Sequence, residues 1–482
     1  MSKSIKKNLA LNIINTVTTV FFPLITFPYA SRIMGPSGIG EVNFLNSIIG
    51  YIVLFMSLGI PMYAVREIAR VRDNAEQMNK TVLEILSLHL GLTFLGYVAV
   101  VIIGIFVPQV NANLPLFLIL SLTLLFTTIG CDWFYQGTED FKYITIRGIT
   151  VKTVSMILLF VLVHSPKDIL LYGVYCVAGS VGGNIFNFIR LRKFIHTDKN
   201  IFKSLHPLRH LRPSLEIFTL NVITSIYLQL NNVMLGFYKG STAVGFYTAA
   251  TKLMSVVLTI SNALGPVIMP RVSNLLAEHK DEEFKRLAQK SYNFSFALTL
   301  PLSIGLFFVS PYAVRLLCGS QFEPAIAAAQ IVAPIIFVVS FSGFMGTQTL
   351  YPMGKVKIII FCTFLGCLAD LILNIILMPI LSFKGAAISY LSAEIVVSLS
   401  MFIIARKMIP VSYINKSIGN YCLAAILMSI GLYMMSLLQS KDIIVLLSMT
   451  FVGVVIYGLV LLIRKDDFAL EILNIAKRKL HL

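Results

Sequence analysis

The sequence predicts an all-α integral membrane protein, and three observations support this fold class. Hydrophobic residues make up 57% of the 482 residues and charged residues only 13%, whereas soluble domains carry about 25% charged residues. Apolar segments of about 20 residues, the length that crosses a bilayer as a helix, follow one another along the chain. The Lys and Arg residues gather between these segments, mainly in alternate loops. No polar stretch is long enough to form a soluble domain.

We expect about fourteen transmembrane helices. Their approximate ranges are 9–33, 41–65, 81–107, 115–137, 144–165, 168–190, 215–237, 242–269, 291–312, 325–351, 358–380, 385–405, 416–437 and 443–463. The first range follows Lys3, Lys6 and Lys7, but no small-residue cleavage site follows it, so it is a span and not a signal peptide. An even number of helices places both termini on the same side of the membrane.

The basic residues orient these helices. Of the 39 Lys and Arg residues, 31 lie on the side of the amino terminus and 6 on the opposite side. Because positive residues accumulate in cytoplasmic loops, both termini are predicted to be cytoplasmic, in the inner membrane of a bacterium. The net charge of +17 therefore reflects membrane topology. No nucleic-acid partner is predicted, because the charge does not gather on one soluble face.

The two halves of the chain resemble each other at an offset of 205 residues. The matching pairs are Gly35 with Gly240, Gly40 with Gly245, Pro61 with Pro266, Arg66 with Arg271, Lys80 with Lys285, and Lys152 with Lys357. Each half holds six helices that start from the cytoplasm, so the repeats are parallel, as in transporters that work by alternating access. The predicted domains are an amino-terminal lobe at 1–205 and a carboxy-terminal lobe at 206–410. Helices 13 and 14 and an amphipathic cytoplasmic tail follow at 411–482.

Cations within or at the ends of the predicted helices are candidates for a binding cavity, because a charge in the bilayer costs about 2.5–3.5 kcal/mol on insertion scales. The candidates are Arg32, Arg66, Lys152, Lys252 and Arg271. Together they predict a cationic cavity for an anionic ligand, with Arg suited to bidentate binding of phosphate. Asn231 and Asn232 make helix 7 polar and suit sugar hydroxyls. The alternatives stay open: the cations as snorkelling or positive-inside anchors, and the amides as helix–helix contacts.

Three acidic residues are candidates for ion coupling or gating. Asp370 and Glu394 lie mid-span in helices 11 and 12, where they bind a coupling ion, H⁺ or Na⁺, or form a structural ion pair, with Lys252 among the candidate partners. Asp132 lies beside Trp133, the single tryptophan. No other cofactor, metal site or catalytic residue is predicted. The six cysteines form no C-x-x-C pair, and the sequence has no G-x-S-x-G, H-E-x-x-H or P-loop motif.

Three blocks of sequence resemble Wzx-type flippases, the polysaccharide-biosynthesis branch of the MATE-like (MOP) exporter superfamily. The blocks are FPYASRIMGPSGIGEVNFLNSIIGYIVLFMSLGIPMYAVREIARVRD at 27–73, IGCDWFYQGTEDFKYITIRGI at 129–149 and AVGFYTAATKLM at 243–254. The resemblance implies a transporter, not an enzyme, with two MATE/MOP-like lobes of six helices. It would move an undecaprenyl-pyrophosphate-linked oligosaccharide from the inner to the outer leaflet, for O-antigen, capsule or exopolysaccharide assembly.

The resemblance also implies partners and a place for the lipid. By likeness to the lipid II flippase branch, helices 13 and 14 would form a groove for the lipid tail. Membrane lipids, a polysaccharide polymerase and a chain-length regulator are the expected partners. Two other functions are alternatives to this one. A MATE-type exporter of small molecules would favour an anionic cavity, and a membrane polymerase or glycosyltransferase usually needs a long outer loop, which this sequence lacks.

Overall fold

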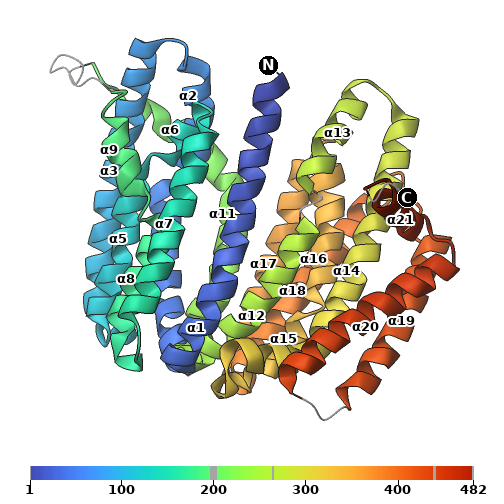
Figure 1. The fold of residues 1–482 in the computed structure, drawn as a ribbon. Helices are drawn as coiled ribbons and strands as arrows, with labels where there is room; N and C mark the ends of the chain where they lie inside the picture. The colour runs from blue at the N-terminus through green and yellow to red at the C-terminus, as the bar shows by residue number, and fades with distance from the viewer. Residues whose placement is uncertain (1, 196–203, 263–264, 438–440, 480–482) are drawn as a thin grey trace. The chain divides into compact units, whose positions relative to one another are not determined.

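The computed structural model describes residues 2–195, 204–262, 265–437 and 441–479, and for some of these, among them 219–228, only the backbone. Throughout the described ranges the regular structure is helical, without strands. The chain forms two compact units, Met1–Gly245 and Phe246–Leu482, which Figure 1 shows as bundles of long helices. The two units are defined by compactness alone and do not test the repeat. The domain boundaries expected from the repeat therefore stay a prediction.

The first unit contains ten helices within its described residues. They are α1 (Ser2–Ser57), α2 (Ile60–Val71), α3 (Ala75–Phe106), α4 (Pro108–Asn111), α5 (Leu114–Gly130), α6 (Asp132–Gly137), α7 (Phe141–Leu162), α8 (Ile169–Val181), α9 (Asn184–Leu191) and α11 (Leu211–Lys239). A short turn, η2 (Pro207–His210), leads into α11. The long α1 packs against α3, α5, α7 and α11.

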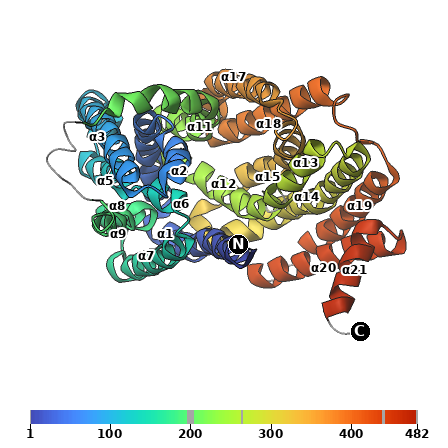
Figure 2. The ribbon, with the colours of Figure 1, turned by 90° about the horizontal axis from the view of Figure 1, so that it is seen from above.

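The second unit begins inside α12 (Ser241–Asn262). Its further helices are α13 (Gly265–Ala277), α14 (Asp281–Cys318), α15 (Ala325–Val332), α16 (Ile335–Gly343), α17 (Val356–Leu381), α18 (Phe383–Ala405), α19 (Lys416–Ser436), α20 (Asp442–Ile463) and α21 (Asp467–Lys479), with a π-helical segment at Phe344–Leu350. α17 packs along α18, and α19 packs along α20. Figure 2 shows α19, α20 and α21 as a group beside α14.

The spans agree with the predicted membrane fold. Eleven helices of the described ranges are long and apolar enough to cross a membrane, or twelve if the bent pair Pro166–Val181 and Asn184–Leu191 is one span. The longest, Phe21–Val71, takes in most of the first two predicted spans. α11 covers the seventh predicted span without being among the eleven. The all-α multi-span fold is confirmed, and the number fourteen stays a prediction.

Two glycines that are matched in the internal repeat have nearly the same backbone conformation. Gly35 adopts φ 64° and ψ −179° at the kink in α1, and Gly240 adopts φ 77° and ψ −179° between α11 and α12. Residues other than glycine rarely adopt this left-handed φ with an extended ψ. The same backbone break therefore separates the first two helices of each half, although in the first half both fall within one long helix.

Candidate functional site

A polar site forms in the first unit where α5 ends and α6 begins. Cys131 has φ 45° at this break, so Asp132 is the first residue of α6. One guanidinium nitrogen of Arg147 on α7 lies 2.7 Å from Oδ1 of Asp132. The Arg147 side chain is 13% exposed and that of Asp132 is 43% exposed. Asp132 is thus half of a partly buried ion pair.

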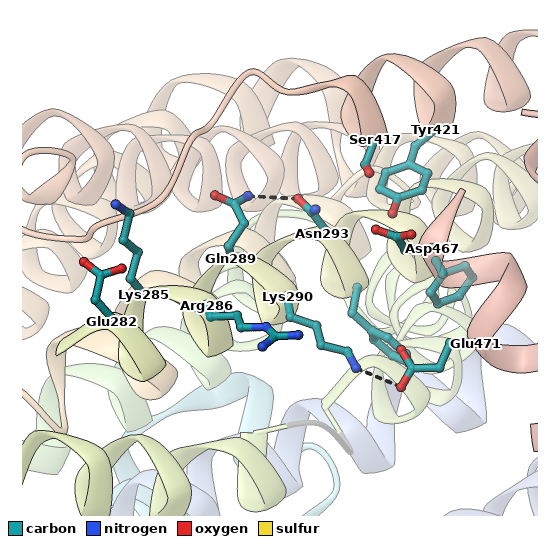
Figure 3. A pocket seen from close by; sticks show the side chains of 12 residues that line it. Glu282, Lys285, Arg286, Gln289, Lys290, Asn293, Ser417, Tyr421, Asp467 and Glu471 are labelled. Atoms are coloured by element: carbon teal, nitrogen blue, oxygen red, sulfur yellow. Dashed lines mark hydrogen bonds and ion pairs between the residues drawn. The ribbon is translucent and has the colours of Figure 1, made fainter. Parts of the chain in front are cut away.

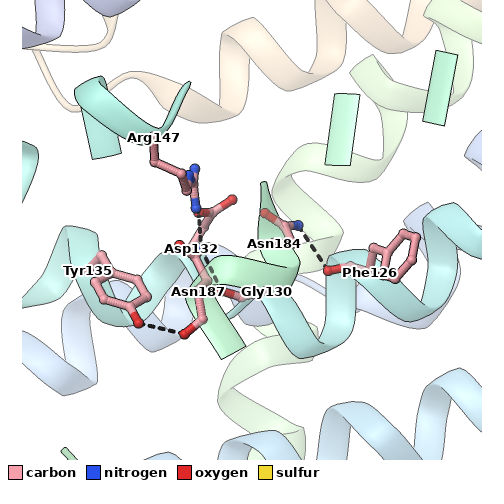
Figure 4. Close-up of polar contacts among 7 residues, drawn as sticks. All are labelled: Phe126, Gly130, Asp132, Tyr135, Arg147, Asn184 and Asn187. Atoms are coloured by element: carbon pink, nitrogen blue, oxygen red, sulfur yellow. Dashed lines mark hydrogen bonds and ion pairs between the residues drawn. The ribbon is translucent and has the colours of Figure 1, made fainter. Parts of the chain in front are cut away.

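Two asparagines of α9 complete this site (Figure 4). The Asn187 side-chain amide donates to Oδ1 of Asp132 and to the carbonyl of Gly130, each at 2.7 Å. Asn184 donates to the carbonyl of Phe126 at 2.9 Å. The last four carbonyls of a helix have no partner within that helix. Here Asn187 of α9 supplies a donor to one of them, the carbonyl of Gly130. A Cβ on Gly130 would come within 2.4 Å of the Asn184 side chain, so a glycine is needed at this position.

A cavity of about 550 Å³ lies beside this ion pair. Among the residues that line it are Asp132, Gln136, Asn184, His89 and Trp133. His89 and Trp133 are buried, whereas Asp132 and the exposed Gln136 present polar groups. The cavity therefore offers hydrogen-bonding groups on an otherwise apolar wall, and Asp132 is the one predicted site residue among its lining.

The predicted cations of the first unit lie on three different helices. Arg32 is exposed on α1, Arg66 is exposed on α2, and Lys152 is half-buried on α7. Arg66 lies 3.7 Å from Glu67, its neighbour in sequence, which is the geometry of a surface pair of little energetic weight. In the second unit Lys252 is exposed on α12 and Arg271 is exposed on α13. Their role as a phosphate cavity stays a prediction.

One of the two predicted asparagines of α11, Asn232, lies on the contact of α11 with α1. Asn231 is buried, and the Asn232 amide donates to Oγ of Ser47 at 3.2 Å. Asn232 therefore serves, at least in part, as a helix–helix hydrogen bond, the alternative that the sequence left open. The contact joins the polar face of α11 to α1 and does not by itself assign a sugar-binding role.

The predicted acids of the second unit lie inside the helix pair α17 and α18. Asp370 is 0% exposed and Glu394 is 8% exposed. Asn374, one turn after Asp370 on α17, is also buried. Lys252 makes no ion pair with a carboxylate of the described residues, so the pairing considered from sequence is not found. The two acids lie on neighbouring helices, and their role in binding a coupling ion stays a prediction.

An apolar groove runs along the second unit between α14, α19 and α20. Its volume is about 580 Å³, and its lining is almost wholly apolar. Pro301 and Gly305 of α14 line it, as do Gly453 and Gly458 of α20. These residues have little or no side chain, which leaves room between the helices. The sequence predicted a groove at helices 13 and 14, which correspond to α19 and α20.

Sequence reasoning missed Arg147, Asn184 and Asn187. Arg147 lies about two turns into α7 and within the predicted span 144–165, where a charged residue indicates a candidate site. Asn184 and Asn187 are polar residues one turn apart in a predicted span, the kind of signal that indicates a buried contact or a site. The break between α5 and α6 that brings them to Asp132 was not predicted.

Taken together, the long apolar helices and the repeated helix break define a multi-span membrane protein. The family described as "Polysaccharide biosynthesis protein" matches residues 5–276, and the MatE family matches residues 217–376. The first match covers more than half of the chain. The chain therefore belongs to the polysaccharide biosynthesis protein family, a branch of the MOP exporter superfamily.

Individual relatives agree with this family. The chain is 24% identical over 407 residues to the putative O-antigen transporter of Escherichia coli (strain K12), covering 84% of this chain and 97% of that protein. It is 26% identical over 396 residues to the putative O-antigen transporter of Shigella dysenteriae, with 82% and 98% covered. The solved structure of the lipid II flippase MurJ in an inward closed conformation has a TM-score of 0.75 over 95% of this chain and 99% of that one. At 14% identity, this last likeness shows the fold alone.

Proposed function

We propose that this transporter is a flippase for a lipid-linked oligosaccharide, carried on undecaprenyl pyrophosphate from the cytoplasmic to the outer leaflet by alternating access. The observation that carries the proposal is the apolar groove of α14, α19 and α20. Helices α19 and α20 lie outside the six-helix repeat, and an exporter of small soluble molecules has no use for a lipid-sized groove. The names of the relatives, O-antigen transporters, support the same substrate class.

The headgroup and the tail need different surroundings. A pyrophosphate carries about two negative charges, and moving these through hydrocarbon without partners costs far more than binding returns. Arg32, Arg66, Lys152, Lys252 and Arg271 are the residues that we expect to lower this barrier, with Arg as the bidentate phosphate ligand. The lipid tail stays in hydrocarbon throughout, so the apolar groove has only to match the shape of the tail and needs no charged partner.

We assign the driving step to a coupling ion, H⁺ or Na⁺, at the buried acids of the second unit. Asp370 is buried on α17 and Glu394 on α18. A carboxyl group at such a place exchanges a proton or binds a cation more readily than it remains an isolated charge. Asp132, with its Arg147 partner, is the candidate for gating in the first unit.

The proposed setting is the bacterial inner membrane with both termini in the cytoplasm. The distribution of Lys and Arg along the sequence supports this orientation. A flippase of this kind delivers its product to the outer leaflet, so a polysaccharide polymerase and a chain-length regulator are the expected protein partners there. Reporter fusions at the carboxy terminus test this orientation. A fluorescent protein that stays dark there, together with a periplasmic reporter that is active at the same place, would show that the predicted orientation is wrong.

Complementation tests the proposed function. The chain is expressed in a bacterium whose own flippase is deleted and which makes the cognate glycan, and outer-leaflet lipid-linked oligosaccharide is labelled. We expect labelling with the wild-type chain and its loss with Lys252→Ala at an unchanged protein level. Lys357→Ala, which changes an exposed cation of the same unit, is the matched control. Absence of labelling with the wild-type chain would favour a small-molecule exporter, and normal labelling with Lys252→Ala would remove Lys252 from the site.

A further inference from the structure

A second cavity of the second unit is polar and takes no part in the site described above. It has a volume of about 660 Å³ and lies between the first turns of α14, the start of α19 and α21 (Figure 3). Six charged residues line it: Glu282, Lys285, Arg286, Lys290, Asp467 and Glu471. Three of these are cations and three are acids, so their formal charges cancel. The cavity therefore favours neither anions nor cations as such.

Part of the cavity wall is fixed by hydrogen bonds. The backbone N–H of Ser412 donates to Oε1 of Gln289 at 2.7 Å, and the Gln289 amide donates to Oδ1 of Asn293 at 3.1 Å. Asn415 donates to the same Asn293 oxygen at 3.0 Å. These bonds hold the loop before α19 against α14, so the wall is already ordered without a ligand.

Charges of both signs remain available inside the cavity. Lys290 lies 2.8 Å from Glu471 and is thereby neutralised. Arg286 and Asp467 belong to no ion pair found among the residues that the structure describes. In Figure 3 the Arg286 side chain extends along the cavity toward Lys290, and Asp467 lies at the opposite wall near Tyr421. A ligand that carries one negative and one positive group would satisfy both.

The polar cavity continues into the apolar groove. Phe468 lines both, and it packs edge-on against Phe294 with ring centres 5.0 Å apart. The turn before α21 is fixed by Asp466, which is buried and accepts hydrogen bonds from Asn420 and Tyr421 at 3.1 and 3.0 Å. Phe468 is thereby held at the junction of a charged pocket and an apolar groove. Such a junction matches the two ends of an amphiphile.

The groove is long enough for an acyl chain. Its lining on α20 runs from Met449 to Leu462, which at 1.5 Å per residue is about 20 Å. One leaflet of the hydrocarbon core is about 15 Å thick. A chain anchored at Phe468 can therefore lie along the groove for the full depth of the leaflet.

We infer that this composite site binds a phospholipid with a phosphoethanolamine headgroup. Arg286, with Lys285 beside it, would hold the phosphate, Asp467 would hold the ammonium group, and one acyl chain would lie in the groove. The proposed function gives the same groove to the substrate tail. This last step rests on the proposed function: the phospholipid occupies the groove when no substrate is bound and leaves when the substrate tail enters.

The balance of charge decides between headgroups. An anionic phosphatidylglycerol or a pyrophosphate would meet Arg286 but would bring no cationic group to Asp467, and it would also face the carboxylate of Glu282. A zwitterionic headgroup meets a partner at each end. The expected order is therefore phosphatidylethanolamine above phosphatidylglycerol, which reverses the order expected of a simple basic patch.

The test is lipid binding by the purified full chain, measured by native mass spectrometry with phosphatidylethanolamine and phosphatidylglycerol of equal chain length. We expect the wild-type protein to retain phosphatidylethanolamine preferentially. Arg286→Gln should weaken binding of both lipids about tenfold, the effect of one charge-assisted contact. Asp467→Asn should weaken phosphatidylethanolamine alone and so abolish the preference. Lys357→Gln, an exposed cation outside the cavity, should behave as the wild type.

Three results would overturn the inference. The first is equal retention of both lipids by the wild-type protein. The second is retention that Arg286→Gln leaves unchanged in a variant that remains folded by its melting temperature. The third is retention of undecaprenyl pyrophosphate above phosphatidylethanolamine with the same dependence on Arg286, which would make the cavity a substrate-loading site. Because binding is measured without transport, failure of complementation leaves the lipid result standing, and the converse also holds.

Discussion

The pair of Asp132 and Arg147 joins three helices at one point. Arg147 comes from α7, Asp132 from α6, and Asn187 of α9 donates to the same carboxylate oxygen. The Arg147 side chain is only 13% exposed, so the Asp132 carboxylate compensates its charge for the water that burial removes. Removing one member of a buried pair costs about 3–5 kcal/mol, whereas an exposed pair contributes up to about 1 kcal/mol.

We predict that Asp132→Ala lowers stability by about 1–3 kcal/mol, between those limits because the carboxylate is partly exposed. Asp132→Asn should cost less, since the amide oxygen still accepts from Asn187. Thermal unfolding of the purified protein measures both. Glu139→Ala is the control, because Glu139 pairs with Arg72 at 2.7 Å with both side chains exposed. Equal melting temperatures for all three variants would contradict the structural role of the pair.

A second cluster of polar side chains attaches the turn η2, just before α11, to helix α3. Glu84 is fully buried on α3 and accepts from the backbone N–H of His206 at 2.9 Å and from Nε2 of His210 at 3.0 Å. Arg209 is in ion-pair contact with the same carboxylate. The Tyr63 hydroxyl oxygen lies 2.6 Å from Nδ1 of His210. Both ring nitrogens of His210 therefore have polar partners.

The pKa of His210 predicts a pH dependence of this attachment. Burial lowers that pKa below the ordinary value of 6.5, against the opposing effect of Glu84. The folded state therefore binds fewer protons than the unfolded one, so the contribution to stability is present above about pH 6.5 and is lost as the pH falls below it. Hydrogen exchange at 204–214 should accelerate at pH 5.5 relative to pH 7.5. After correction for intrinsic exchange, we expect a smaller acceleration in His210→Leu than in the wild-type protein. An identical acceleration in the two proteins would exclude His210 as the titrating group.

At the scale of elements, the groove between α14, α19 and α20 depends on glycines. A Cβ added at Gly458 meets no atom within 4 Å, although the residue lines the groove. A larger side chain there enters the groove without disturbing the helices around it.

We predict that Gly458→Leu weakens transport of the lipid-linked substrate several-fold while headgroup analogues without a lipid tail bind as before. Gly419→Leu is the matched control, because Gly419 is also free of neighbours and lies on α19 outside the groove. Outer-leaflet labelling and binding of the water-soluble analogue are the two measurements. Equal losses for both ligands would remove the groove from the tail-binding role.

At the scale of the whole molecule, the internal repeat has a structural expression beyond sequence identity. Gly40 and Gly245 approach each other's helices so closely that a Cβ on Gly40 would lie 1.7 Å from the Ser241 carbonyl oxygen. A Cβ on Gly245 would lie 1.9 Å from the Pro36 carbonyl oxygen. Within the first unit, each of the two matched glycines thus lies against the segment that carries the other.

We predict that Gly40→Ala destabilises the protein by about 1–3 kcal/mol, the usual cost of overpacking, and reduces transport to a similar extent as Gly245→Ala. Gly91→Ala is the control, since a Cβ at Gly91 of α3 has no neighbour within 4 Å. Melting temperature and complementation are measured together. A melting temperature of Gly40→Ala equal to that of the wild type would show that the two segments separate easily.

The sequence by itself determined the membrane class, the family and most helix positions. The physical reason is that hydrocarbon tolerates only long apolar helices, so composition and length decide where the chain crosses. The same rule placed Asp370 and Glu394 within membrane-spanning helices, whereas their burial is seen only in the structure. The glycine pair Gly35 and Gly240, matched at the offset of 205, lies at the repeated backbone break, because both residues occupy a conformation that other residues avoid.

Only the tertiary structure decided which polar groups meet. Asp132 and Arg147 are 15 residues apart, and Asn187 comes from a third helix. Their contact depends on the break at Cys131, where a non-glycine residue takes a positive φ that no local pattern indicated. Glu84 and His210, 126 residues apart, meet for the same kind of reason. Hydropathy fixes each helix in the membrane but not its rotation or its neighbours, and side-chain contacts depend on both.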